Sequence, residues 1–146
     1  MTSATHLARR FLTSLSHTPP PADDTAWAIG HLLPTEAELW EQMTVQDRRH
    51  SIVVARRFVE FAPSAERAEV AGALLHDVGK LASGLGTLSR VFATLVGPRW
   101  DRFRQYHDHG RLGAEMLVAA GSRSVTVELV RGRGPRSAEL RRADNV

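Results

Sequence analysis

A histidine and an aspartate interrupt an apolar stretch near the middle of the chain. The apolar residues are Val70, Ala71, Ala73, Leu74, Leu75 and Val78, and His76-Asp77 are the only titratable residues among them. A helix that is apolar on all sides is buried, and burying an imidazole and a carboxylate is unfavourable unless both find partners. Adjacent helical residues diverge by about 100°, so both side chains can reach one ion seated near the end of this helix.

Lys80 follows this pair and is the only lysine among 19 basic residues. It lies three residues after Asp77 and four after His76, hence on the same side of a helix. An ammonium is a compact point charge, unlike the flat guanidinium of arginine. We expect it to bind an anionic substrate beside the ion. The alternative is a lysine that caps carbonyls at the helix end.

His50 is a second polar residue on a mostly apolar segment. Taken alone, such a histidine is more often a satisfied core residue or a surface residue than a ligand. The order of the motifs is more informative than any one of them. It reads D-x-x-H-S around His50, then L-L-H-D-V-G-K, then A-D ending at Asp144.

This order resembles the H…HD…D signature of the HD superfamily of metal-dependent phosphohydrolases, from about Met43 to Asp144. The resemblance implies a compact, all-α bundle of helices. It also implies four ligands for one divalent metal ion: His50, His76, Asp77 and Asp144. Gly79 and Lys80 are similar to the HDxGK form of the motif, in which the lysine contacts substrate phosphate. Asp77 and Lys80 would thus be the catalytic residues.

The segment that begins at His109 is similar to the H-x-x-x-G-A-x-x-L stretch of the HDIG and HD-GYP branches. That likeness implies a substrate-side role for His109, although a solvent-facing histidine is the alternative. Those branches carry further histidines on the next helix, where this chain has Arg131 and Arg133. The chain also lacks the G-Y-P loop. We therefore expect a mononuclear site and do not expect cyclic-di-GMP as the substrate.

Two histidines and two aspartates favour Mn²⁺, Fe²⁺, Co²⁺, Ni²⁺ or Zn²⁺ over Mg²⁺, which prefers oxygen ligands alone. Such an ion activates water and polarises a phosphoryl oxygen. The resulting hypothesis is a phosphomonoesterase or phosphodiesterase that acts on a small, phosphorylated, nucleotide-like substrate. The alternative is a catalytically degenerate HD domain that binds a nucleotide or a protein and signals. Nucleic-acid binding through the arginine-rich residues 90–142 has no supporting motif, and we do not expect it.

The pattern of apolar residues, caps and breakers predicts the helices that position these side chains. Thr35, Thr44, Ser64 and Ser137 are the predicted N-caps, and Pro63 and Gly121 the predicted terminators. Residues 1–34 form an N-terminal helix and a proline-rich connection, and residues 35–146 form the metal-binding domain of the same structural unit. The helices are expected at 5–15, from 35, from 45 to before Pro63, from 65 to 78, and at 88–96, 100–106, 111–120, 125–130 and 138–143.

The composition fits one globular domain. The chain has 146 residues, of which 42% are hydrophobic, and a net charge of +3. It has no cysteine, which excludes thiol catalysis, zinc–thiolate sites and disulfides. No stretch approaches the roughly 20 apolar residues of a membrane span. We therefore expect a cytoplasmic protein without a membrane partner.

Overall fold

A computed structural model describes residues 17–82 and 109–146. These residues form seven α-helices and one 3₁₀-helix, with no strand among them, as the sequence predicted. The predicted helices at 5–15, 88–96 and 100–106 lie outside the described residues. In order, the elements are α2 (Ala22–His31), α3 (Pro34–Gln42), α4 (Val45–Phe61), α5 (Arg67–Leu74), η1 (Val78–Ala82), α8 (His109–Ala119), α9 (Ser124–Val130) and α10 (Ser137–Asn145).

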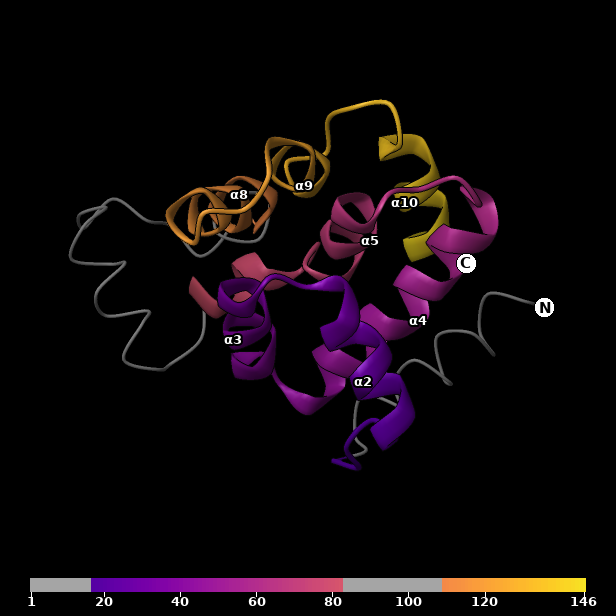
Figure 1. Cartoon of the computed structure of the whole chain (residues 1–146), viewed down its shortest axis with the longest axis vertical. Coiled ribbons are helices and arrows are strands. Elements are labelled where there is room, and N and C mark those ends of the chain that lie inside the picture. The colour runs from indigo at the N-terminus through magenta and orange to yellow at the C-terminus, as the bar shows by residue number, and fades with distance from the viewer. Residues whose placement is uncertain (1–16, 83–108) are drawn as a thin grey trace.

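Helix α5 lies at the centre, with α2, α4 and α9 packed around it (Figure 1). Every residue of α5 after Arg67 is buried, and all of these residues except Glu69 are apolar or glycine. Gly72 allows α9 to approach closely, since a Cβ at this position would lie 3.0 Å from Cδ2 of Leu129. The apolar stretch found in the sequence is thus the core of the bundle.

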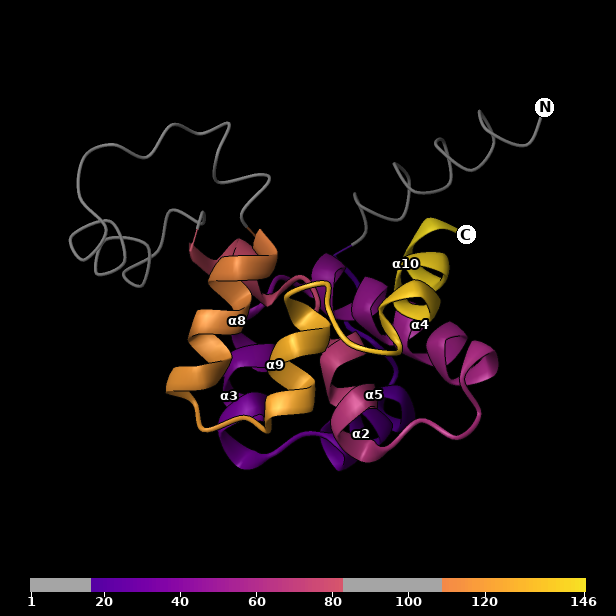
Figure 2. The ribbon, with the colours of Figure 1, turned by 90° about the horizontal axis from the view of Figure 1, so that it is seen from above.

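Helix α4 packs one face against α5, and α10 packs along its length. The two figures agree that α10 lies beside α4, although the two helices are far apart in the sequence (Figure 2). Ile52, Val54, Ala55 and Phe58 are buried, whereas Val53 is 45% exposed. The buried face is therefore set by spacings of three and four residues from Ala55 and Phe58.

Several helix starts differ from the sequence prediction. Thr44 does cap α4, because its hydroxyl accepts a hydrogen bond from the amide of Asp47. Thr35 and Ser64 do not cap α3 and α5. There, Glu36 and Glu69 reach back to the amide of the residue that precedes each helix, at 2.8 and 2.9 Å. A carboxylate at the third position of a helix accepts a hydrogen bond from the amide of the N-cap residue. A hydroxyl cap alone would leave that amide unpaired. Likewise, Ser137 is the first residue of α10 rather than its cap.

The segment that we expected to be only a connection contains α2, whose Ala28 is fully buried. The predicted terminator Gly121 is confirmed. It has a φ of +76°, and the amide of Ser122 bonds to the carbonyl of Leu117, which closes α8. The valine-rich α9 is helical, as predicted. In the parts of the chain that the structure describes, no helix is both long and apolar enough to cross a membrane.

Candidate metal centre

His76 lies in the turn between α5 and η1, not at the end of a longer helix as predicted. Helix α5 ends at Leu74, and the bonds Val78 N to Leu75 O and Lys80 N to Asp77 O tighten the chain into the 3₁₀-helix. The ring of His76 supports this turn, with Nδ1 at 2.8 Å from the carbonyl oxygen of Ala73. A carbonyl only accepts, so Nδ1 carries the proton. In the neutral ring, Nε2 is then left with a free lone pair.

Nε2 of His76 is buried and has no hydrogen-bond partner. Its nearest acidic neighbours are Oδ2 of Asp77 at 3.5 Å and Oδ1 of Asp144 at 3.6 Å. At 3.6 Å, the contact with Asp144 is too long to count as a hydrogen bond. A cation bound between this buried nitrogen and the two carboxylates would accept the free lone pair and balance the negative charges.

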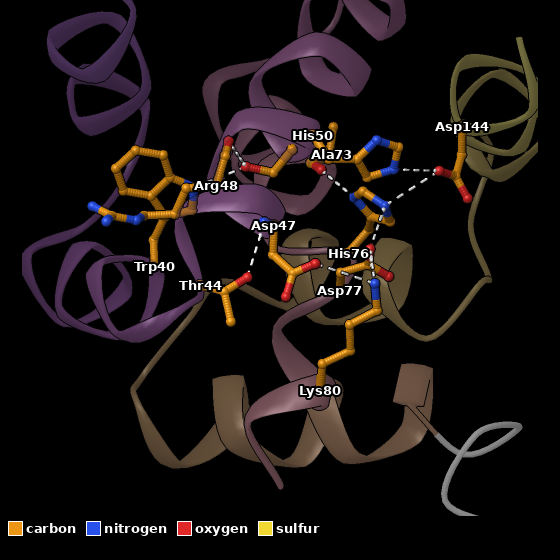
Figure 3. Close-up of polar contacts among 11 residues, drawn as sticks. Trp40, Thr44, Asp47, Arg48, His50, Ala73, His76, Asp77, Lys80 and Asp144 are labelled. Carbon is orange, nitrogen blue, oxygen red and sulfur yellow. Dashed lines mark hydrogen bonds and ion pairs between the residues drawn. The ribbon is translucent and has the colours of Figure 1, made fainter. Parts of the chain in front are cut away.

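Helices α4 and α10 bring two further side chains to this nitrogen. Nε2 of His50 lies 2.9 Å from Oδ1 of Asp144, and the His50 and His76 rings are 5.7 Å apart (Figure 3). The ligand atoms of His50, His76 and Asp144 all lie within 4.8 Å of one another. Thus the packing of α10 on α4 places the last aspartate of the sequence beside the first histidine of the motif.

Asp77 joins this group from the other side. The oxygen that faces His76, Oδ2, also lies 2.9 Å from Nζ of Lys80. Asp77 is not among the three residues, His50, His76 and Asp144, whose possible ligand atoms all lie within 4.8 Å of one another. The carboxylate of Asp77 lies between His76 and Lys80.

The spacing of these atoms fits a first-row divalent ion. For a metal–nitrogen bond of about 2.1 Å, neighbouring ligand atoms are about 3.0 Å apart in an octahedron and about 3.4 Å apart in a tetrahedron. The observed separations from His50 to Asp144, His76 to Asp77 and His76 to Asp144 are 2.9, 3.5 and 3.6 Å. Small side-chain movements would bring these atoms into the coordination sphere of one ion.

The electrostatics of the site follow from the same contacts. Burial lowers the pKa of His76, but Asp144 and Asp77 outweigh it, and the net pKa is raised above 6.5. Contact with His50, and then with His76, holds the pKa of Asp144 far below its ordinary value. Burial raises the pKa of Asp77, but His76 and Lys80 outweigh it, and the net pKa is lowered. Both carboxylates are charged at neutral pH and are ready to accept a cation.

Asp47, the first residue of the D-x-x-H-S motif, is a site residue to which the sequence analysis assigned no role. Its Oδ1 lies 3.4 Å from Nζ of Lys80 (Figure 3). The signal in the sequence was its position three residues before His50, which places both on one side of α4. Burial lowers the pKa of Lys80, but Asp77 and Asp47 outweigh it, and the net pKa is raised.

His109 is the first residue of α8, and its pKa responds to the charges of Lys80, Asp77 and Asp47. Burial, and then the charge of Lys80, lower its pKa, while Asp77 and Asp47 act in the opposite direction. Gly79 allows this placement, because a Cβ there would clash with the carbonyl oxygen of His109. Helix α8 thus packs directly on η1, next to Lys80.

The two arginines that replace histidines in the related branches have other partners. Nη1 of Arg131 bonds to Glu128 at 3.2 Å. Arg133 lines a separate apolar hollow between α9 and the residues before α10, together with Leu129, Pro135 and Arg136. None of the predicted metal ligands lines that hollow.

Residues 48–141 match the model of the HD domain family. Comparisons with curated proteins and with solved structures gave no significant match. The matched range includes His50, His76 and Asp77, and Asp144 lies just beyond it. The match covers most of the chain and agrees with the all-helical fold, and the chain belongs to the HD domain family.

Proposed function

We propose that this chain is a metal-dependent phosphohydrolase, a phosphomonoesterase or phosphodiesterase, acting on a small, phosphorylated, nucleotide-like substrate. His50, His76, Asp77 and Asp144 would hold one divalent ion of the Mn, Fe, Co, Ni or Zn type. Membership of the HD domain family supports the reaction class. The single observation that carries the proposal is the buried, unpartnered Nε2 of His76 opposite two charged carboxylates.

When bound, the ion would lower the pKa of water and polarise a phosphoryl oxygen. Residues of the chain would provide access to the ion and would bind the substrate. His50 and Asp144, each about a third exposed, leave the ligand group open to solvent on the side of α10. Lys80 is 39% exposed and carries three N–H donors, so it can turn part of its ammonium toward a phosphoryl oxygen. His109, the first residue of α8, which packs on η1, would supply a further substrate contact.

The choice of ion follows from the donors. Two imidazole nitrogens among the ligands favour the first-row transition metals, and Mg²⁺ is disfavoured because it keeps oxygen ligands and water. Because the Nδ1–H of His76 is held by a backbone carbonyl, its ring is already oriented for coordination through Nε2.

A hydrolysis screen tests the proposal. The chain would be loaded with Mn²⁺ and assayed against phosphomonoesters, phosphodiesters and nucleotides, with His76→Ala as the inactive control. We expect turnover in the wild type that depends on added metal and is lost in the variant. Metal binding without any turnover would favour the alternative, a degenerate HD domain that only binds a nucleotide or a partner protein. Turnover that is unaffected by His76→Ala would contradict the proposed site.

A further inference from the structure

Helix α10 carries the proposed ligand Asp144 but packs lightly on the rest of the domain. It lies at the edge of the bundle, beside α4 (Figure 1 and Figure 2). Of its nine residues only Leu140 and Ala143 are buried, whereas α9 buries four residues of seven. The contact from Nη1 of Arg57 to the carbonyl oxygen of Val146 is exposed. Few apolar contacts therefore hold α10 in place.

The connection between α9 and α10 has the features of a hinge. Gly132 and Gly134 have φ values of +83° and +94°, in a region that other residues rarely adopt. Nothing lies within 4 Å of a Cβ at either position. Gly134 and Pro135 also border the apolar hollow next to α9. A few loop residues of this kind can change φ and ψ without breaking contacts of the core, which is how hinges work.

The centre that α10 borders is closed to an incoming ion. Nε2 of His76 is buried, although the side of the ligand group next to α10 faces solvent. On that side, Nε2 of His50 and Oδ1 of Asp144 are only 2.9 Å apart. An ion that reaches His76 from solvent must therefore separate His50 from Asp144 or displace another neighbour of His76.

The proposed ligands come from elements that differ in how firmly they are packed. His50 lies on α4, whose buried residues include Ile52 and Phe58. Asp77 follows the buried α5, and α8 packs on η1, which comes next. Asp144 is joined to His50 by a contact that is about a third exposed, and such pairs stabilise a fold only weakly. Because elements with few buried contacts are the first to open locally, α10 is the neighbour that moves most easily.

This inference rests on the proposed metal centre. We propose that α10 is a gate of that centre: it moves away on the glycine-containing connection to admit the ion, and the bound ion then fastens it through Asp144. In the metal-free chain, opening of α10 breaks the contact between His50 and Asp144 and exposes little apolar surface. In the metal-bound chain, the same opening also breaks the bond between Asp144 and the ion. Metal occupancy thereby controls whether α10 stays docked on α4.

Hydrogen exchange followed by mass spectrometry tests the gate on the full chain, in chelator and with Mn²⁺ at about 100 times its Kd. In chelator, we expect the amides of α10 to exchange faster than those of α5 and α9. Mn²⁺ should slow exchange in α10 by up to about 100-fold. In Asp144→Ala, which keeps the other three proposed ligands, saturating Mn²⁺ should leave the exchange of α10 nearly unchanged. Arg142→Ala should keep the protection by Mn²⁺, because the Arg142 guanidinium contacts Phe61 and none of the proposed ligands.

The rate at which Mn²⁺ is released to excess chelator measures the gate independently. Leu140→Ala truncates the larger of the two buried side chains of α10, so it should speed release at least about tenfold. Leu129→Ala is the matched control, because it truncates a similarly buried leucine in α9, which supplies no proposed ligand. This variant should release Mn²⁺ at the wild-type rate. If a leucine variant does not fold, the exchange in the wild type and in Asp144→Ala decides.

Three results would each overturn the gate and leave the metal centre intact. They are exchange in α10 that is no faster than in α9, protection by Mn²⁺ that survives in Asp144→Ala, and equal release rates from the two leucine variants. A wild type that binds no Mn²⁺ would overturn the metal centre itself, and the gate with it.

Discussion

Nε2 of His50, on α4, lies 2.9 Å from Oδ1 of Asp144, on α10, although the two residues are 94 positions apart. This contact joins the first and last residues of the proposed ligand set. It exists because α10 packs along α4, and it closes the ligand group around His76.

Asp144→Asn should weaken metal binding. The substitution keeps the shape of the side chain but removes the charge that faces both histidines. Loss of a partner of a ligand commonly lowers metal affinity about 10–100-fold, and loss of a ligand should cost no less. Because Asp144 is 38% exposed, the effect on the stability of the metal-free chain should stay below about 1 kcal/mol. Calorimetry with Mn²⁺ measures the affinity.

The control for this variant is Arg142→Ala on the same helix. The Arg142 guanidinium lies over the ring of Phe61, 4.0 Å from its centroid, and contacts none of the proposed ligands. The Arg142→Ala variant tests whether any perturbation of α10 is enough to lower the metal affinity. Equal metal affinity in Asp144→Asn and the wild type would remove Asp144 from the ligand set.

Metal binding should weaken on acidification before the carboxylates protonate. The pKa of His76 is raised above 6.5, so a proton competes for its Nε2 from a higher pH than in an ordinary histidine. We expect Mn²⁺ affinity to fall as the pH decreases through that raised pKa. Titration at several pH values measures it, and an affinity that is constant from pH 8 to 6 would contradict it.

The folding stability of the metal-free chain should depend on pH in the opposite sense to the metal affinity. A raised pKa means that the folded state holds the proton of His76 more tightly. This stabilisation is fully present below 6.5 and is lost as the pH rises through the folded pKa. The lowered pKa values of Asp77 and Asp144 stabilise the fold above 3.8, and this contribution is lost on further acidification. Melting temperatures in chelator should therefore peak on the acidic side of neutrality, and His76→Gln should remove the fall on the alkaline side.

Gly79→Ala should destabilise the fold and disturb the site together. The new Cβ would clash with the carbonyl of His109 and meet the amide of Gly113 at 3.0 Å, and both are backbone atoms that cannot rotate away. Overpacking of this kind costs about 1–3 kcal/mol. Gly30→Ala is the matched control, because nothing lies within 4 Å of a Cβ there. Chemical denaturation of both variants measures the difference, and equal stabilities would show that α8 can move away from η1.

Lys80→Arg should impair turnover without changing the number of metal ions. Arginine keeps the charge, but its flat fork is longer than the compact ammonium that fits between Asp47 and Asp77. A lost hydrogen bond to a charged group is worth about 1.5–3 kcal/mol, so we expect kcat/KM to fall at least about tenfold. Steady-state kinetics on the substrate found in the screen measures this. Unchanged kinetics would mean that Lys80 only caps the turn.

The sequence points to the proposed ligands more clearly than to their surroundings. His76 and Asp77 stand out because they are polar in a stretch that must be buried, and His50 and Asp144 follow from the order of the motif. Asp47 could not be distinguished from a cap partner, because a position three residues after Thr44 serves both purposes. Helix α2 was missed because prolines precede it and its one fully buried residue, Ala28, gives little apolar signal. The turn at His76 depends on a side-chain bond to Ala73 that no helical periodicity reveals.

Anomalous diffraction from a crystal of the chain grown with Mn²⁺ tests the central claim most directly. We predict one strong peak per chain, within bonding distance of Nε2 of His50 and His76 and of carboxylate oxygens of Asp77 and Asp144. A crystal with Mn²⁺ in the solution and no peak between these four side chains would contradict the account.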